Sequence, residues 1–382
     1  METSHVPVVE MRGTPRQKGQ AHGEALAPKI AETMARWRAD IATAYDPDVD
    51  GFIDSFLGAT HFPAALERWT PHLLEEIDGI AEGAGQPARD VRALNFMDEQ
   101  WWFNAERKAA GDVPEGKNCT SFGSADSAAR TTLMGQTMDI AAWSEGLQAL
   151  LHLHDDDGRE TYVFTFAGFI GLLGLNSRGV GICCNALLEL DHSDRGLPVA
   201  AVMRGVLGHD DPTSAAAFVN SINHASGQNY VIGGPGEVMS LECSATSVAP
   251  YADGARLCHT NHPLSNTDTA HYRTRTGKSA DETLDFTGTN SMARMASIES
   301  RLIAPGQTVD LDSCKAALAS EDDPANPIAR RLDTDKPNII GYTAGTVIYE
   351  LSDQSALHFA AGPASVTPFQ SYKFAAKARD AA

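Results

Sequence analysis

Cys119 is the residue of this 382-residue chain whose position most suggests chemistry. Residues 109–117, which precede it, are small and polar and include Gly and Pro, as in exposed loops. From Cys119 onward the sequence changes to short strand-like segments, so the thiol lies where a loop gives way to a sheet. A free cysteine is more often a small buried apolar residue than a nucleophile. Composition and position alone therefore leave both interpretations open.

Two pairs of histidines raise the alternative of a metal centre. His152 and His154 alternate on one face of an extended strand, beside three aspartates at 155–157. His259 and His262 are three apart, which puts them on opposite faces of a strand. A zinc site needs a third and usually a fourth ligand, and the sequence does not place one. We therefore expect solvated or structural histidines and predict no metal site, and a zinc hydrolase is the third-ranked function.

Several common motifs are absent from the chain. It has no phosphate-binding loop of the G-x-x-x-x-G-K-[ST] type, no H-E-x-x-H and no G-x-S-x-G. The Gly-Gly-Pro-Gly run at 233–236 lies between two strand-like segments with no helix after it, which predicts a turn rather than a dinucleotide site. We predict no cofactor.

Charge and composition exclude some partners. Thirty Lys and Arg against fifty Asp and Glu give a formal net charge of −20, which repels phosphate backbones and anionic headgroups. Neither nucleic acid nor a membrane is expected as a partner. The N-terminus lacks a signal-peptide pattern, and the longest apolar stretch, 166–175, is shorter than the roughly 20 residues that span a bilayer. The six cysteines follow no disulfide spacing, so we expect reduced thiols and a cytoplasmic protein.

The periodicity predicts helices first, then strands interleaved with pairs of helices. A strand at 6–11 precedes a helix that begins with a capping box at Thr14 and runs past Trp37. Gly19 and Gly23 in this helix indicate close packing against a neighbour, because each glycine costs about 1 kcal/mol relative to alanine. Further helices are expected at 63–84, 88–103, 198–207, 212–222, 291–302 and 311–319, and strands at 131–138, 147–154, 160–167, 180–186, 228–232, 237–242, 256–259, 346–351 and 356–360. This order favours a layered α+β protein over a doubly wound parallel sheet.

The strongest signal is a resemblance that begins at the cysteine. Cys119-Thr-Ser, followed by Gly-Gln-Thr-Met-Asp at 135–139, resembles the start of the β-subunit in the penicillin acyltransferase precursor family. That family belongs with the N-terminal-nucleophile hydrolases and is related to the choloylglycine hydrolases. Four more blocks follow the family's order, at 13–23, 76–83, 175–185 and 259–262. Residues 290–302, which include Arg294, resemble the family more loosely.

The resemblance implies a fold and a division of the chain. The fold would be a four-layer αββα N-terminal-nucleophile sandwich preceded by a helical segment. Residues 1–118 would form a helical pro-segment, or α-subunit, packed on the core, and residues 119–382 the catalytic β-subunit. The two cleaved fragments would stay associated.

The resemblance also implies roles for single residues. Cys119 is the nucleophile, Asp139 orients it or its amino group, and Asn261 supplies an oxyanion-hole amide. Asn185 and Thr137 are expected to contact the substrate. The cleavage site is the bond between Asn118 and Cys119. Asn118 stands where the penicillin enzyme has glycine, Thr137 replaces an asparagine, and the arginine that the penicillin enzyme carries has no counterpart at 339–346.

These roles predict one thiol used twice. Cys119 attacks the Asn118 carbonyl, and water then releases the first fragment. The new α-amino group, which titrates near ~7.7–8.0 against ~8.5 for a thiol, can accept the thiol proton. The expected substrate is a small N-acyl amide that reacts through a thioester, with water, an amine or an acyl-coenzyme A as further reactants. The alternative is an unprocessed, non-catalytic member of the same fold that binds a ligand. Apolar side chains at 166, 169, 172 and 173 are expected either to line an acyl pocket or to pack in the core.

Overall fold

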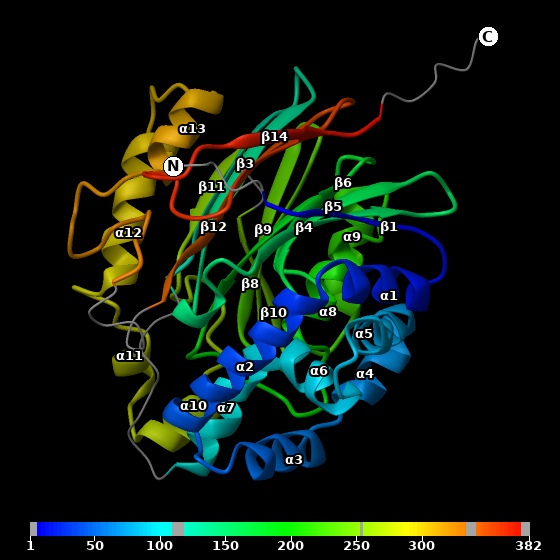
Figure 1. Ribbon diagram of the computed structural model, residues 1–382. Helices are drawn as coiled ribbons and strands as arrows, with labels where there is room; N and C mark the ends of the chain where they lie inside the picture. Colours follow the sequence, from blue (N-terminus) through cyan, green and yellow to red (C-terminus); the bar gives the residue numbers. More distant parts are fainter. Residues whose placement is uncertain (1–5, 109–117, 253–254, 334–340, 376–382) are drawn as a thin grey trace.

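Two β-sheets packed face to face form the centre of the protein (Figure 1). The computed structural model describes residues 6–108, 118–252, 255–333 and 341–375. Within these residues sheet A has eight strands, in the order β1 (Val8–Met11), β4 (Gln148–His154), β5 (Glu160–Phe166), β6 (Leu173–Asn176), β7 (Gly181–Ala186), β8 (Gln228–Gly234), β9 (Glu237–Cys243) and β10 (Val248–Ala252). Sheet B has six, in the order β11 (Arg256–His259), β2 (Thr120–Asp126), β3 (Thr131–Ile140), β12 (Tyr342–Leu351), β13 (Ala356–Ala360) and β14 (Gln370–Lys373).

Helices cover the outer faces of both sheets. Those that precede β2 are α1 (Pro15–Ala25), α2 (Ala27–Ala44), α3 (Val49–Ala59), α4 (Phe62–Trp69), α5 (Pro71–Ala84), α6 (Ala88–Asn95) and α7 (Met97–Arg107). On sheet A, α8 (Val199–Val206) packs on β7 and α9 (Pro212–Ser221) on β8. On sheet B, α12 (Asn290–Ile298) and α13 (Leu311–Leu318) pack on β2, β3 and β12. Short helices complete the chain: η1 (Ala142–Ser144), α10 (Ala270–Thr276), α11 (Ala280–Thr283) and η2 (Glu299–Ile303). The predicted α+β class and its helix–sheet–sheet–helix layering are confirmed (Figure 1).

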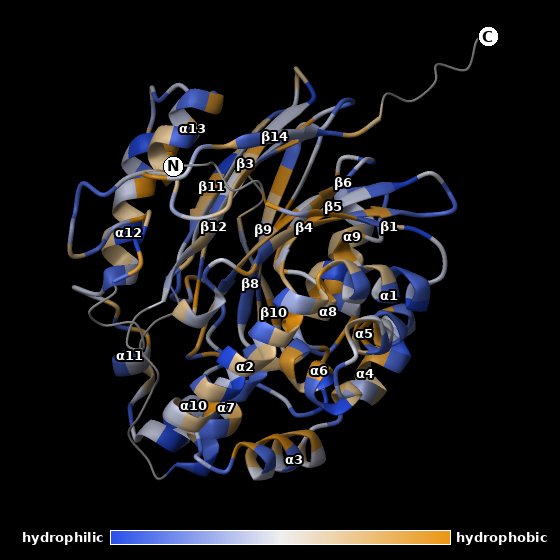
Figure 2. Ribbon diagram, viewed as in Figure 1, coloured by the Kyte–Doolittle hydropathy of each residue, from blue (hydrophilic) through white to orange (hydrophobic). Residues whose placement is uncertain are grey.

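Polar as well as apolar side chains join the two sheets. The side-chain amide of Gln136 on β3 donates to the Cys184 carbonyl at 2.6 Å, and the Cys184 N–H donates back to Gln136 Oε1 at 2.8 Å. Close to this pair, the Tyr349 hydroxyl donates to the Ile182 carbonyl across the same layer, at 3.3 Å. Figure 2 shows apolar residues on strands of both sheets and on helices such as α5 and α6. Buried hydrogen bonds of this kind fix the relative position of the sheets more tightly than apolar contact alone.

Glycines allow α1 and α5 to touch through their backbones. A Cβ atom placed on Gly19 or Gly23 would run into backbone atoms of α5, and one placed on Gly79 or Gly83 would run into backbone atoms of α1. All four glycines lie at i, i+4 spacing on facing helix surfaces. The close packing predicted from Gly19 and Gly23 is therefore confirmed, and the partner is α5.

Three predicted helices are each split in two. The helix expected to run from Thr14 past Trp37 breaks at Leu26, that at 63–84 breaks at Thr70, and that at 88–103 breaks at Phe96. The break at Thr70 directly precedes Pro71, which lacks an N–H and disfavours helical geometry in the preceding residue. The break at Leu26 lies two residues before Pro28, which is tolerated in the first turn of α2. The prediction of three continuous helices was wrong, and α3 was not predicted.

The predicted strands all occur, with ends shifted by a few residues, and the turns at 155–158 and 233–236 join β4 to β5 and β8 to β9. Strands β6, β10 and β14, of four or five residues each, were missed. The loop predicted at 109–117 lies outside the described residues. Among the described helices, none has both the length and the apolar character needed to cross a lipid bilayer.

The packing of α1 on α5 gives a stability prediction. Gly19→Ala should lower the free energy of unfolding by about 1–3 kcal/mol or more, because the added methyl group meets backbone that cannot rotate away. Urea unfolding followed by circular dichroism measures the change. Gly58→Ala in α3 is the matched control, since a Cβ there meets nothing within 4 Å, and it should be neutral or stabilising by up to about 1 kcal/mol. Equal losses in the two variants would contradict the backbone contact.

Candidate functional site

Cys119 lies immediately before β2, with 4% of its surface exposed. Its Sγ is 3.6 Å from Met138 Sδ and 4.0 Å from the carbonyl oxygen of Asp139, both on β3. Asn118, by contrast, is only partly buried. The peptide bond between the two residues therefore joins a partly buried residue to a buried one.

Arg294 on α12 is the centre of the polar network around Cys119. Its guanidinium donates to the carbonyl oxygen of Cys119 at 2.6 Å, to Thr120 Oγ1 at 2.8 Å and to Asn261 Oδ1 at 3.0 Å. Its Nε also donates to Asn290 Oδ1 at 2.7 Å. The side chain has no exposed surface. Burial lowers the pKa of Arg294 to about 10, against the charges of Asp139 and Cys119 that raise it, so the group stays cationic near neutral pH.

Asn261, in the loop after β11, is fixed by contacts on both ends of its side chain. Its Oδ1 accepts from Arg294, and its Nδ2 donates to the Ala186 carbonyl at 3.0 Å. Its backbone N–H donates to Ser291 Oγ at 2.8 Å. A primary amide carries two N–H groups, and the contacts among the described residues use one of them. The second can donate to an oxyanion, which fits the role expected for Asn261.

Asp139 lies on β3 beside Cys119, with 2% of its surface exposed. Its Oδ1 accepts from the Thr343 hydroxyl at 2.6 Å, and its Oδ2 lies 3.6 Å from Arg330 Nε. Burial raises the pKa of Asp139 to about 6, although Thr343 and the charges of Arg294 and Arg330 oppose this shift. The carboxyl group can therefore change its protonation state close to neutral pH.

Asn185 and Thr137, the two residues expected to contact substrate, lie in different places. The Asn185 side chain is buried between the sheets, where its Oδ1 accepts from Ser121 Oγ at 2.7 Å and its Nδ2 donates to the His259 carbonyl at 3.4 Å. Thr137 is directly opposite Thr120 in the β2–β3 pair, so its side chain lies on the face of sheet B that carries Arg294. The Thr137 hydroxyl is buried and makes no hydrogen bond among the described residues. Their substrate contacts stay predictions.

A cavity of about 790 Å³ opens next to this network. Its wall includes Tyr342, which pairs with Ile140 one residue beyond Asp139, together with Lys29, Gln148 and Arg331. Cys119 does not line this cavity. Nor do the apolar side chains at 166, 169, 172 and 173, which are buried in the core; core packing explains them.

The histidines at 259 and 262 have structural partners. His259 Nε2 lies 2.7 Å from Glu242 Oε1, and both side chains are fully buried. His262 Nδ1 lies 2.7 Å from Ser291 Oγ, the serine that also binds the backbone of Asn261. Neither histidine belongs to a group of three possible metal ligands among the described residues. The pair fixes the loop that carries Asn261.

Sequence reasoning missed Arg294 and Arg330 as members of the site. Arg294 was noted only within a loosely matching stretch, and its link to Cys119 spans more than 170 residues of sequence. The one local signal is the i, i+4 spacing of Asn290 and Arg294, which places both side chains on one face of α12. No periodicity in the sequence connects Arg330 with Asp139.

The fold and the site together define an α+β sandwich in which a cysteine, a carboxylate, an amide and an arginine meet at the start of a central strand. The sequence profile of the acyl-coenzyme A:6-aminopenicillanic acid acyl-transferase family matches residues 127–355, more than half of the chain. The chain belongs to this family of acyltransferases. The matched region begins after Cys119 and contains Asp139, Asn185, Asn261 and Arg294. The family predicted from the sequence is thus confirmed.

Individual relatives are more distant. The acyl-coenzyme A:6-aminopenicillanic-acid-acyltransferase 40 kDa form of Emericella nidulans is 28% identical over 265 residues, which cover 68% of this chain and 70% of the relative. Protein dcd1A of Dictyostelium discoideum is 25% identical over 244 residues, 55% of this chain and 52% of that protein. The chain thus spans about half the length of dcd1A.

Two solved structures are similar at low identity. A conjugated bile acid hydrolase from Clostridium perfringens has a TM-score of 0.42 and 12% identity, over 67% of this chain and 97% of that one. Penicillin V acylase from Agrobacterium tumefaciens has a TM-score of 0.39 and 16% identity, over 67% and 86% of the two chains.

The raised pKa of Asp139 gives a pH-dependent stability prediction. The folded pKa of about 6 lies above the ordinary value of 3.8, so the folded state binds this proton more tightly than the unfolded state does. The contribution of Asp139 to stability is greatest below pH 4 and falls as the pH rises to 6. Relative to Asp139→Asn, the wild type should lose about 2–3 kcal/mol of unfolding free energy across this window, measured by urea unfolding at each pH.

Asp310→Asn is the control for that experiment. Asp310 caps α13 from an exposed position, and hydrogen bonds from the backbone of Ser313 lower its pKa. The contribution of Asp310 to stability should therefore increase as the pH rises, which is the opposite direction. This change should occur below pH 4. If the difference in unfolding free energy between wild type and Asp139→Asn does not vary between pH 4 and 6, the raised pKa of Asp139 is contradicted.

Proposed function

We propose that the protein is a self-activating amide hydrolase or acyltransferase whose nucleophile is the thiol of Cys119 at a new N-terminus. The observation that carries this proposal is the convergence of Cys119, Asp139, Arg294 and Asn261 at the start of β2. Acyl transfer needs a nucleophile, charged groups that position it, and a hydrogen-bond donor to the oxyanion. Membership in an acyltransferase family supports the same chemistry.

Self-cleavage would use the thiol first. The sulfur attacks the carbonyl carbon of Asn118, the bond to the Cys119 nitrogen breaks, and the thiol proton passes to that nitrogen. The product is a thioester between Asn118 and the Cys119 sulfur. Water hydrolyses it to a free carboxylate on Asn118 and a free thiol. The chain then consists of residues 1–118 and of 382 − 118 = 264 residues that begin with Cys119. The short path from amide to thiol inside one residue makes this step intramolecular.

After cleavage, the α-amino group of Cys119 is the base. An α-amino group titrates at ~7.7–8.0, close to working pH, and so can accept the thiol proton without a separate histidine. Asp139, next to the nucleophile on β3, is the group that orients this amine. In the intact chain burial raises the pKa of this carboxyl, and an ammonium beside it would lower that pKa again. Such an arrangement resembles the terminal-threonine variant of nucleophilic catalysis.

The catalytic cycle then follows from the same contacts. Sulfur attacks the carbonyl of an N-acyl amide, a thioester forms, and the amine leaves with a proton from the Cys119 ammonium. Water or a second amine attacks the thioester and restores the thiol. The Asn261 amide stabilises the oxyanion, and Arg294 holds both Asn261 and the backbone of Cys119 in place.

The substrate is a small N-acyl amide. The name of the Emericella nidulans relative combines an acyl-coenzyme A donor with an amine acceptor, and both reactants fit one thioester intermediate. All six cysteines are buried and none forms a disulfide, which supports the reducing conditions of a cytoplasmic location.

The alternative is an unprocessed protein of the same fold that binds a ligand. One observation favours it: Asn118 stands before the nucleophile, where glycine would leave the attacked carbonyl more accessible. In that case Cys119 stays inside an intact chain with its nitrogen in a peptide bond.

Cleavage is tested by intact mass and a denaturing gel. Wild-type protein purified after expression should consist of two fragments divided between Asn118 and Cys119. Cys119→Ala should remain whole and inactive, because a methyl group cannot form the thioester. Cys314→Ala, which removes another buried thiol, on α13, is the matched control and should be cleaved as in the wild type. A wild-type chain that is intact yet turns over amides would refute the self-cleavage.

The oxyanion role is tested separately on cleaved protein. Asn261→Ala should lower kcat by about 10²–10³, the usual effect of losing one oxyanion donor, with a smaller change in KM. A panel of N-acyl amines, with and without an added amine acceptor, supplies the substrates. Asn220→Ala on α9 removes an exposed amide and should leave kcat unchanged. An unchanged kcat for Asn261→Ala would remove Asn261 from the mechanism.

A further inference from the structure

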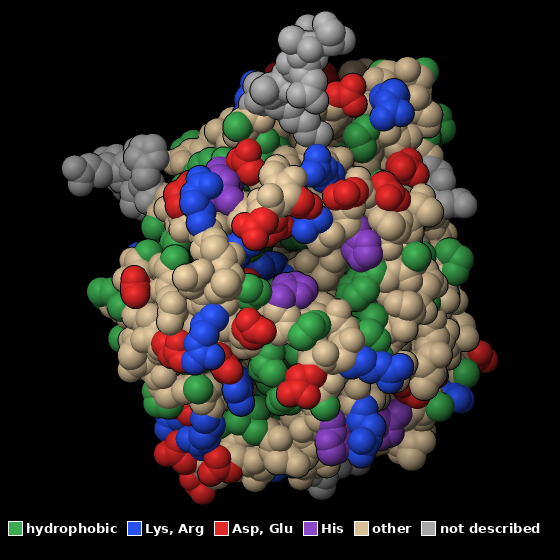
Figure 3. All heavy atoms as spheres, turned by 90° about the vertical axis from the view of Figure 1, so that its right-hand side faces the viewer, with side chains coloured by type: hydrophobic (Ala, Val, Ile, Leu, Met, Phe, Trp, Pro, Cys, Tyr) green, Lys and Arg blue, Asp and Glu red, His purple; other side chains and the backbone are tan. Residues whose placement is uncertain are grey.

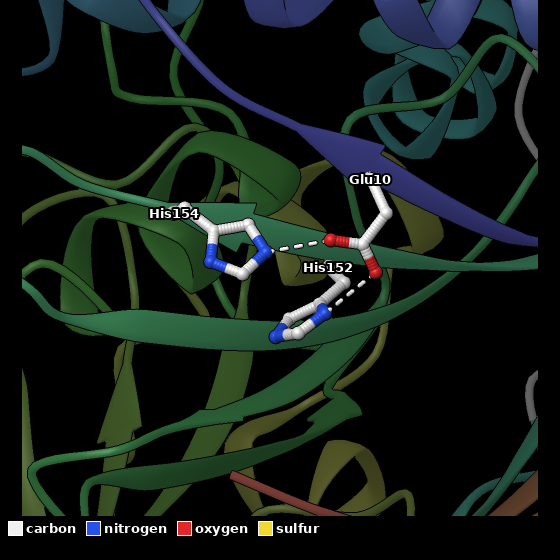
Figure 4. A group of neighbouring side chains, drawn as sticks. All are labelled: Glu10, His152 and His154. Carbon is white, nitrogen blue, oxygen red and sulfur yellow. Dashed lines mark hydrogen bonds and ion pairs between the residues drawn. The ribbon is translucent and has the colours of Figure 1, made fainter. Parts of the chain in front are cut away.

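A second cluster of reactive side chains lies at the edge of sheet A. Glu10 on β1 reaches across to the neighbouring strand β4, where its Oε1 is 2.8 Å from His152 Nδ1 and its Oε2 is 2.7 Å from His154 Nε2 (Figure 4). One ligand atom from each of the three residues lies within 4.8 Å of the other two. Glu10 pairs with His152 in the parallel register of β1 and β4, which brings the carboxylate between the two rings.

A fourth residue, Glu160 on β5, completes the cluster. Its Oε2 is 2.8 Å from His152 Nε2, so the imidazole of His152 lies between two carboxylates. A neutral imidazole carries a hydrogen on one nitrogen and a lone pair on the other. When Nε2–H donates to Glu160, the Nδ1 lone pair faces the negatively charged Glu10. A cation between Nδ1 and Glu10 removes this repulsion.

His154 presents the same conflict. Its Nε2 lies 2.7 Å from Glu10 Oε2 and also 2.9 Å from Arg12 Nη2. One ring nitrogen cannot donate to the carboxylate and accept from the guanidinium at the same time. A metal ion bound by the Nε2 lone pair and by Glu10 satisfies both groups, with the Arg12 side chain turned away into solvent. Arg12 is 65% exposed and can make this movement.

We propose that Glu10, His152 and His154 bind a zinc ion that ties β1 to β4. Two imidazole nitrogens and one carboxylate oxygen are the ligands of many zinc sites, with water in the fourth position. Glu160 then takes the place of the carboxylate that commonly accepts the second N–H of a metal-bound histidine and fixes its tautomer. Stacking of His152 on Tyr162, with ring centres 4.2 Å apart, holds the ring in this orientation.

The cluster is open to solvent on one side, so an ion can enter. The Glu10 side chain is 54% exposed, while those of His152 and His154 are 11% and 16% exposed. Figure 3 shows the face to the right in Figure 1, where histidines reach the surface among mixed acidic and basic side chains. Entry requires only that Arg12 swing away.

The two sides of the cluster belong to different parts of the chain. Glu10 lies before Cys119 and both histidines lie after it. A zinc ion would therefore link strand β1 to the catalytic part by a bond that survives cleavage of the main chain. This consequence rests on the proposed self-cleavage, whereas zinc binding itself does not.

A similar group elsewhere in the protein provides an internal control. Glu106 Oε1 lies 2.8 Å from His192 Nε2 and 3.6 Å from His271 Nε2. In the described part of the chain no second carboxylate faces His192, so one N–H donated to Glu106 satisfies that contact without a cation. The two groups share their residue types and differ in the surroundings of the imidazole.

Zinc binding is tested by calorimetric titration of metal-free protein, with the uncleaved Cys119→Ala variant as the first sample. We expect a site of micromolar or tighter affinity, no heat with Mg²⁺, and a rise in Tm of a few degrees with excess zinc. His154→Gln and Glu10→Gln should each remove this site. His271→Gln should retain it. Arg12→Gln should strengthen binding several-fold, because it removes the competing cation, an effect that loss of structure would not produce.

Clear results would overturn the proposal. Zinc that binds His154→Gln as tightly as the parent protein places the ion elsewhere, and loss of zinc only in His271→Gln assigns it to the Glu106 group. If zinc does not bind to the parent protein, the proposal is wrong, and hydrogen bonds alone hold the cluster together. Circular dichroism of each variant confirms that the fold is retained.

The link between fragments is tested on cleaved wild-type protein. Dissociation in urea, followed by size-exclusion chromatography, should need more denaturant with zinc than with a chelator, and His154→Gln should abolish the difference. If wild type proves uncleaved, zinc binding to Cys119→Ala still decides the metal site, so the two proposals fail independently. Equal dissociation with and without zinc would contradict the link.

Discussion

The guanidinium of Arg294, which has no exposed surface, joins three parts of the chain that are far apart in sequence. It binds the backbone of Cys119 and the hydroxyl of Thr120 at the start of β2, the side chain of Asn261 after β11, and Asn290 one turn earlier on its own helix. Removing a cation from water is costly, and only dense hydrogen bonding offsets that cost. The positions of Cys119 and Asn261 therefore depend on this one side chain.

The segment before Cys119 is built into the sandwich rather than laid on it. Strand β1 extends sheet A, and Glu76 on α5 forms a buried ion pair with Arg204 on α8 at 2.7 Å. His22 Nε2 accepts from the backbone N–H of Gly168, at 3.1 Å, and so joins α1 to the loop after β5. Breaking such a buried pair by removing one partner costs about 3–5 kcal/mol. Contacts of this strength tie the segment before Cys119 firmly to the rest of the protein.

Local sequence patterns predicted which helices and strands occur better than they predicted where each one begins and ends. The capping box at Thr14 forms as expected, with the side chain of Gln17 bound to the cap backbone, because it depends on neighbouring residues alone. The helix breaks at Leu26 and Phe96 depend on what the helices pack against. Strands β6 and β10 pair with strands next to them in sequence, but β6 is buried along its whole length and β10 contains Pro250, so neither alternates between apolar and polar residues. Neither the breaks nor these strands leave a periodic trace in the sequence.

The site was predictable where a motif carried it. Cys119, Asp139 and Asn261 were predicted through their motifs, and the structure places all three around Arg294, while their catalytic roles stay predictions. Arg294 and Arg330 were missed because contacts with residues far away in sequence, not sequence spacing, place them in the site. Glu10 was missed as a partner of the histidines on β4 for a related reason: the parallel pairing of β1 with β4 cannot be read from either strand alone.

The central claim is that thiol and base amine belong to one residue. An adjacent thiol and free amine condense with an aldehyde or a cyanobenzothiazole probe to form a ring, which a cysteine inside a chain cannot do. After denaturation of purified wild-type protein, the account predicts that peptide mapping finds this ring at Cys119 and at none of the other five cysteines. A Cys119 recovered unlabelled, within a peptide still joined to Asn118, would contradict it.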